Sequence, residues 1–112
     1  MANRNKFLEL FISNLTNAVI HKILEKAIDK PDISEKYNKE IKNSWEIAKR
    51  YREKINPMNK NLSDKDIEEI KKKVINKVKS ELIIRIEKGY KNINLSLVKE
   101  FVENSLDEMK VK

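Results

Sequence analysis

Residues 62–89 read LSDKDIEEIKKKVINKVKSELIIRIEKG, and this stretch decides the fold class. Its apolar residues recur every three or four positions, which is the spacing of one face of an α-helix. At its start, Ser63 precedes Asp66 by three residues, and Leu62 and Ile67 flank them as in a capping box with a hydrophobic staple. Gly89 follows the last turn, where a residue in the left-handed conformation ends many helices. The pattern predicts a helix over residues 63–88.

Three further stretches show the helical spacing between signals that begin or end a helix. A wide apolar stripe covers residues 5–30 and ends before Pro31, because proline disfavours helix in the residue that precedes it. A second stripe covers residues 33–55 and ends at Asn56-Pro57, and the last one begins at Asn94. Short connections favour antiparallel neighbours. We therefore predict an all-α fold, a single-domain bundle of four helices at about residues 5–30, 33–55, 63–88 and 94–110, joined by short loops.

The composition excludes most familiar catalytic designs. The 112 residues include one glycine, one histidine and no cysteine. Phosphate-binding loops, dinucleotide fingerprints and strained nucleophile turns need glycine, and thiolate metal sites need cysteine. His21 is followed one turn later by Glu25, and we interpret it as a boundary histidine paired with that carboxylate, because a metal site needs more ligands. We expect no enzymatic activity, no catalytic residue, no cofactor and no metal.

The N-terminal stretch has a basic start and then an apolar segment. Its longest uncharged run, residues 10–20, is far shorter than a membrane span. Polar residues interrupt the apolar segment, and no small-residue cleavage site follows it. We expect a cytoplasmic protein with no integral membrane association.

The apolar stripe of the first helix is wider than one helix of a small bundle usually buries. Such a helix lies either at the centre of a bundle or against a second copy of the chain. We predict a small non-catalytic binding protein that associates with itself or with a protein partner through this helix, and no small-molecule substrate is evident. The predicted partner surface consists of Phe7, Leu10, Phe11, Ile20 and Leu24.

Nucleic-acid binding is the alternative hypothesis. The net charge is +7 and the pI is near 9.5, which favours an anionic partner. Lysine outnumbers arginine 21 to 4, so the charge also fits a lysine-rich composition without selection for binding, and arginine is the residue preferred for bidentate phosphate contacts. The side chains that would contact a nucleic-acid backbone lie on the second and third helices, and they are Lys49, Arg50, Arg52, Lys72, Lys73 and Lys79.

Overall fold

The computed structural model describes residues 3–27, 31–56 and 62–109, and these residues form four helices and no strand. The helices are α1 (Asn3–Ala27), α2 (Pro31–Ile55), α3 (Asp64–Glu87) and α4 (Leu97–Glu108). The predicted all-α bundle of four helices is confirmed. The ends predicted for the first and last helices, near residues 30 and 110, lie outside the described residues.

Helix α3 begins and ends where the sequence predicts. The Ser63 side chain accepts a hydrogen bond from the backbone N–H of Asp66 at 3.2 Å, which satisfies one of the free donors of the first turn. At the other end, Gly89 has a φ of +101°. The N–H of Tyr90 donates to the carbonyl of Arg85 at 3.1 Å, the bond that defines a Schellman motif. The single glycine of the sequence therefore has a structural role.

Two predicted helix starts are displaced. Helix α2 begins two residues early, with Pro31 as its first residue, a position where the missing N–H of proline costs nothing. Helix α4 begins three residues late. The side-chain oxygen of Asn94 accepts from both the backbone N–H and the hydroxyl of Ser96, at 3.0 and 2.6 Å. This local turn holds residues 94–96 out of the regular helix.

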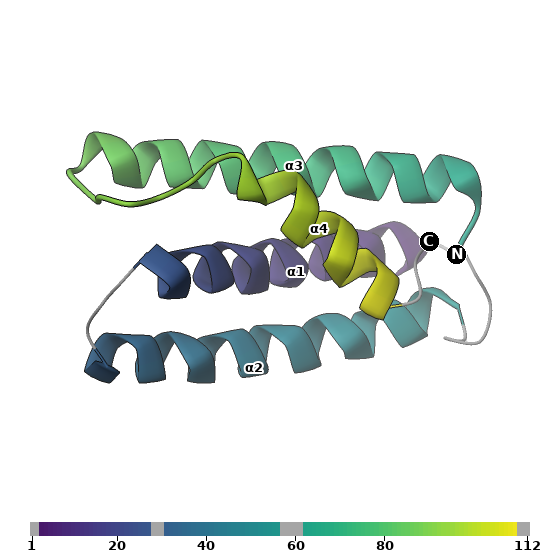
Figure 1. Cartoon of the computed structure of the whole chain (residues 1–112). Helices are drawn as coiled ribbons and strands as arrows, with labels where there is room; N and C mark the ends of the chain where they lie inside the picture. Colours follow the sequence, from purple (N-terminus) through teal and green to yellow (C-terminus); the bar gives the residue numbers. More distant parts are fainter. Residues whose placement is uncertain (1–2, 28–30, 57–61, 110–112) are drawn as a thin grey trace.

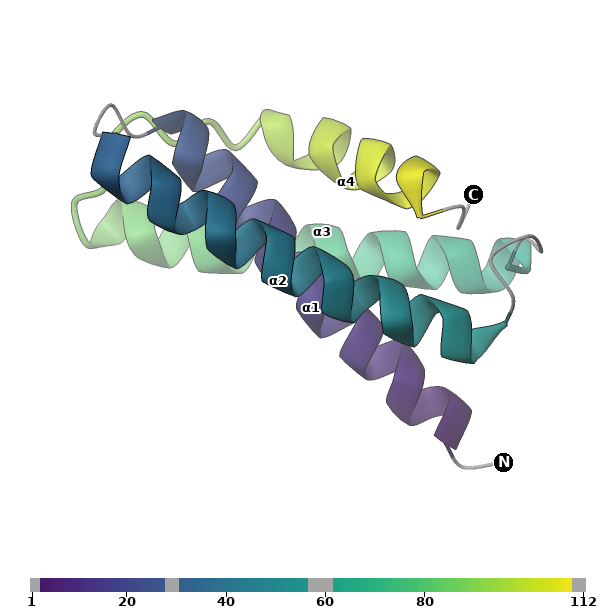
Figure 2. The same cartoon turned by 90° about the horizontal axis from the view of Figure 1, so that it is seen from below.

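Helix α1 is the centre of the molecule (Figures 1 and 2). It packs against α2, α3 and α4, and its contact with α2 is the most extensive. Helix α4 also packs against α3, whereas α2 makes no backbone-level contact with α3 or α4 in the described part of the chain. In Figure 1, α1 lies between α2 and α3, and α4 crosses in front. The molecule measures 43 × 23 × 23 Å along its principal axes.

The hydrophobic core follows from this arrangement. Helix α1 contributes a wide stripe of apolar residues, while α3 and α4 each contribute a narrow one. The residues of the narrow stripes are at most 1% exposed: Ile70, Val74, Val78 and Leu82 from α3, and Val98, Val102 and Leu106 from α4. Helix α2 packs against one helix only, so Tyr37, Trp45 and Tyr51 remain half-buried. No helix in the described residues has the length and apolarity needed to cross a membrane.

Candidate functional site

Most of the predicted partner surface is inside the molecule. Phe11, Ile20 and Leu24 are 0%, 4% and 1% exposed. The prediction that they form a partner surface is wrong, because α1 is covered by three other helices and buries both flanks of its stripe within one chain. Helix α1 therefore lies at the centre of the bundle, which is one of the two arrangements expected for so apolar a helix.

The other two residues of that predicted surface, Phe7 and Leu10, are half-buried. The Phe7 ring stacks on Tyr51 of α2 with a centroid distance of 6.1 Å. The ammonium group of Lys54 lies 5.3 Å from the centre of the Phe7 ring and covers part of it. Phe7 therefore serves mainly to join α1 to the C-terminal end of α2.

The predicted nucleic-acid contacts fall into two separate groups. Lys49 and Arg50 are exposed on α2, while Lys72, Lys73 and Lys79 are exposed on α3. Lys73 pairs with Glu69 one turn earlier at 3.0 Å. Because α1 lies between α2 and α3 (Figure 1), the two groups do not meet in one surface.

The prediction that Arg52 contacts nucleic acid is wrong. Its side chain is 0% exposed, and its guanidinium donates to the backbone carbonyl of Asn56 at 3.2 Å and to the Asn56 side-chain oxygen. Arg52 follows Ser44 and Ala48 at intervals of four residues, and all three occupy the buried face of α2. Burial lowers the pKa of Arg52, since the charged form loses hydration. The four-residue spacing from Ala48 is the sequence signal that could have identified this position.

His21 joins α1 to α2 rather than pairing with Glu25, so that interpretation is corrected. Its Nε2 lies 2.7 Å from a carboxylate oxygen of Glu40 on α2, and its Nδ1 lies 2.8 Å from the backbone carbonyl oxygen of Asn17. Glu25 instead accepts a hydrogen bond from the hydroxyl of Ser34 at 3.0 Å. Both ring nitrogens of His21 therefore face an acceptor within the protein.

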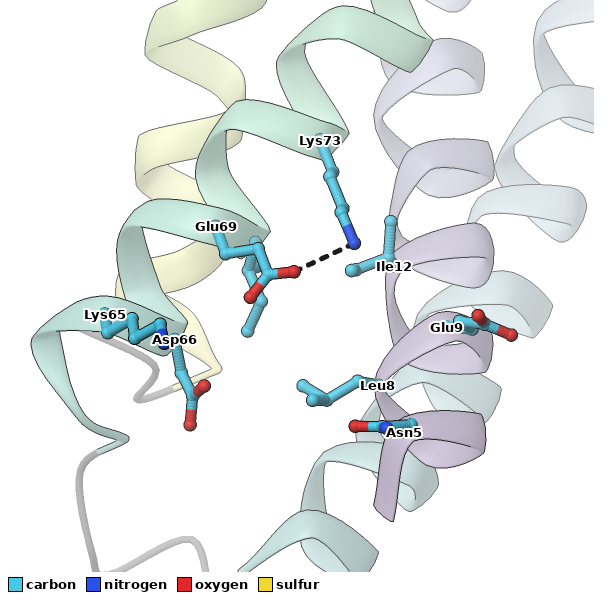
Figure 3. Close-up of a pocket in the computed structure, with 9 residues that line it drawn as sticks. Asn5, Leu8, Glu9, Ile12, Lys65, Asp66, Glu69 and Lys73 are labelled. Atoms are coloured by element: carbon cyan, nitrogen blue, oxygen red, sulfur yellow. Dashed lines mark ion pairs between the residues drawn. The ribbon is translucent and has the colours of Figure 1, made fainter. Parts of the chain in front are cut away.

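A groove between α1 and α3 holds two cavities, and the first lies between the N-terminal halves of both helices (Figure 3). Its volume is about 370 Å³. Leu8 and Ile12 of α1 point into it from one side, and the Glu69–Lys73 ion pair lies along the α3 side. Its other polar lining residues are Asn5, Glu9, Lys65 and Asp66.

The second α1–α3 cavity follows the first along the same two helices and is also about 370 Å³ in volume. Its lining is about half polar and half apolar. Helix α1 contributes Ser13, Thr16, Asn17 and Ile20, and α3 contributes Lys77, Ser80, Glu81 and Arg85. No sequence motif links these residues, because they come from helices about 60 positions apart.

The groups in the second α1–α3 cavity are only partly paired with one another. Arg85 donates to the carboxylate of Glu81 at 3.2 Å, while Lys77 has no ion pair among the described residues. Thr16 is 6% exposed, and its hydroxyl has no hydrogen-bond partner in the described part of the chain. A buried hydroxyl without a partner is rare and costly.

Tyr37 of α2 lies near this end of the groove. Burial raises its pKa, the nearby Tyr90 raises it further, and Arg85 opposes both effects. The side chains of α2 and of the end of α3 therefore approach each other here, although the two helix backbones do not.

Among the residues that the structure describes, no three His, Cys, Asp or Glu side chains come close enough to hold a metal ion. Comparison with known proteins gives no further lead: no family model, no curated protein and no solved structure matches this chain. The assignment of a function therefore depends on the surfaces and cavities of this molecule alone.

Proposed function

We propose that this protein is a small non-catalytic binding protein whose partner is another protein, with a second copy of the chain as the first candidate. The observation that carries the proposal is a group of exposed apolar residues at the C-terminal end of α3. This group, the α3 apolar end, consists of Ile83, Ile84, Ile86 and Tyr90, which are 39–44% exposed. Ile83 and Ile86 lie one turn apart on the same face of α3, and exposed apolar neighbours of this kind favour a contact that removes them from water.

The distribution of the other exposed apolar residues supports this choice. Ile33 and Ile47 of α2 are 37% and 38% exposed, but they lie nearly four helical turns apart. Isolated apolar residues are normal on a protein surface, whereas a group of them is not. The three isoleucines of the α3 apolar end belong to the last turns of α3, beyond the part of the helix that α4 crosses (Figure 1), and Tyr90 follows the turn at Gly89.

The chemistry of His21 supports a non-catalytic role. A general base needs a ring nitrogen within reach of substrate. Both nitrogens of His21 are already engaged, one by the Asn17 carbonyl and the other by Glu40. The chain has no other imidazole and no thiol.

Light scattering on the whole protein tests self-association. At about 100 µM, we expect a mass above the monomer value of 13.3 kDa. The double variant Ile83→Lys/Ile86→Lys should return the mass to that of the monomer, because two charges then occupy the apolar contact. Ile47→Lys is the matched control and should leave the mass unchanged. A monomeric wild-type protein at this concentration would contradict self-association.

Nucleic-acid binding remains the second proposal, and one observation favours it. Lys49, Arg50, Lys72 and Lys79 are exposed, and none of them has an ion pair among the described residues. These charges are therefore available to phosphate groups.

A salt titration of binding to DNA and RNA tests this second proposal. Affinity should fall steeply with added salt. Because the charges lie on two separate helices, Lys49→Glu/Arg50→Glu and Lys72→Glu/Lys79→Glu should weaken binding unequally and so identify the face that is used. Equal and small losses in both variants, or no binding at low salt, would reject a specific nucleic-acid surface.

A further inference from the structure

We propose that the second α1–α3 cavity binds a small hydroxylated organic acid with one carboxylate group. This site is separate from the α3 apolar end and goes beyond the proposed protein–protein interaction. Its volume of about 370 Å³ lies within the range of small-molecule sites, about 300–1,000 Å³. The walls come from α1 and α3. Thr16 is buried and Arg85 is half-buried, while the other polar residues of the lining are exposed: Ser13, Asn17, Lys77, Ser80 and Glu81.

The charge of the ligand follows from the charges of the cavity. Lys77 and Arg85 are cationic, and Glu81 is anionic and already paired with Arg85 at 3.2 Å. One positive charge is thus in excess, on the side of Lys77. One carboxylate on the ligand neutralises this charge, whereas the second negative charge of a phosphate group would be repelled by the carboxylate of Glu81.

The other polar groups of the cavity indicate which groups the ligand carries besides its carboxylate. Ser13 and Ser80 supply hydroxyls from opposite walls, and Asn17 supplies an amide whose nitrogen also donates to Ser44 Oγ of α2 at 3.5 Å. These groups both donate and accept hydrogen bonds, so they fit ligand hydroxyls. None of the described residues that line the site is aromatic, which argues against a planar ring as the main body of the ligand.

Thr16 provides an independent observation at the same place. It lines the cavity, it is more than nine-tenths buried, and its hydroxyl has no partner among the described residues. Threonine in a helix populates two side-chain rotamers, so this hydroxyl can turn toward a guest. An unsatisfied polar group that lowers the stability of the empty protein is typical of a functional site.

The test uses NMR titration of the full chain with D-gluconate, at an ionic strength held constant with sodium chloride. We expect saturable shifts of the amide signals of Ser13, Thr16 and Ser80 at concentrations below about 20 mM. D-Glucose, which lacks the carboxylate, should cause none. No saturable shift with gluconate, or saturable shifts with inorganic phosphate alone, would overturn the proposal.

Variants at the cavity separate a built site from general attraction to a basic protein. Lys77→Gln should weaken gluconate binding about fivefold or more, while Lys79→Gln, an equal charge change on the outer face of α3, should change it less than about twofold. Glu81→Gln should strengthen binding, because it removes the competing carboxylate. Thr16→Val should weaken it about threefold while the protein stays folded. Equal losses in Lys77→Gln and Lys79→Gln would overturn the proposal.

Discussion

Replacement of Thr16 by valine should stabilise the protein in the absence of ligand. Thr16 is 6% exposed, and its hydroxyl has no hydrogen-bond partner in the described residues. Burying such a group without a partner costs about 1–3 kcal/mol. Valine has the same branched shape, and its helix propensity is close to that of threonine. Removal of the penalty and the added apolar contact should therefore raise the free energy of unfolding.

We expect the free energy of unfolding to rise by about 1–2 kcal/mol. This is the lower part of the penalty range, because the extra methyl group needs space that the hydroxyl did not use fully. For a domain of this size, each kcal/mol raises Tm by about 4 °C. Urea unfolding followed by the fluorescence of Trp45, the single tryptophan, measures the difference, and circular dichroism provides a second probe. Both probes should give the same midpoint.

The matched control is Thr16→Ser, which keeps the hydroxyl and removes the methyl group. It should destabilise the protein by about 1 kcal/mol, so the order of stability is Val above Thr above Ser. If valine destabilises the protein instead, the hydroxyl has a partner in solution. That result would refute the reasoning for this position and remove one support of the proposed ligand site.

Three further predictions concern stability. Gly89→Val should cost about 1–2 kcal/mol measured by urea unfolding, because a φ of +101° strains any side chain, and Gly89→Asn should cost less. Arg52→Glu should abolish cooperative unfolding by circular dichroism, since it reverses a charge at a 0% exposed position, whereas Arg50→Glu should leave Tm nearly unchanged. The hydrogen bond to Glu103 raises the pKa of Lys71 above its ordinary 10.5, so this α3–α4 link stabilises the protein below that pH and is lost as pH rises through the folded-state pKa. The Tm of Lys71→Met should therefore lie below that of the wild type at neutral pH and approach it in alkali; a constant difference would contradict the link.

The helices were predictable because their signals are local. Ser63 and Gly89 mark the two ends of α3 through backbone bonds within a few residues, and the structure contains both. The start of α4 was less predictable, because the Asn94 side chain can either cap a helix or form a turn with Ser96. That choice depends on the path of the chain between α3 and α4.

The candidate sites were less predictable than the helices. The sequence determines which helix face carries Phe11 and which carries Arg52, but it does not determine which other helix packs against that face. Phe11 is buried because α1 is central, and Arg52 is buried because it lies on the face of α2 that carries Ala48. The contact of His21 with Glu40 spans 19 positions and could not be distinguished from the local pairing with Glu25.

The sequence by itself determined that this protein is a helical bundle, where α3 begins and ends, and that its glycine is structural. These properties depend on hydrogen bonds and side-chain spacing within a few turns. Only the tertiary structure decided which faces are free, because burial depends on how helices cross. It placed α1 at the centre, left the α3 apolar end exposed, and brought Thr16 and Lys77 to one cavity. Helices distant in sequence meet only through that packing, so a surface or site built from two of them has no sequence motif.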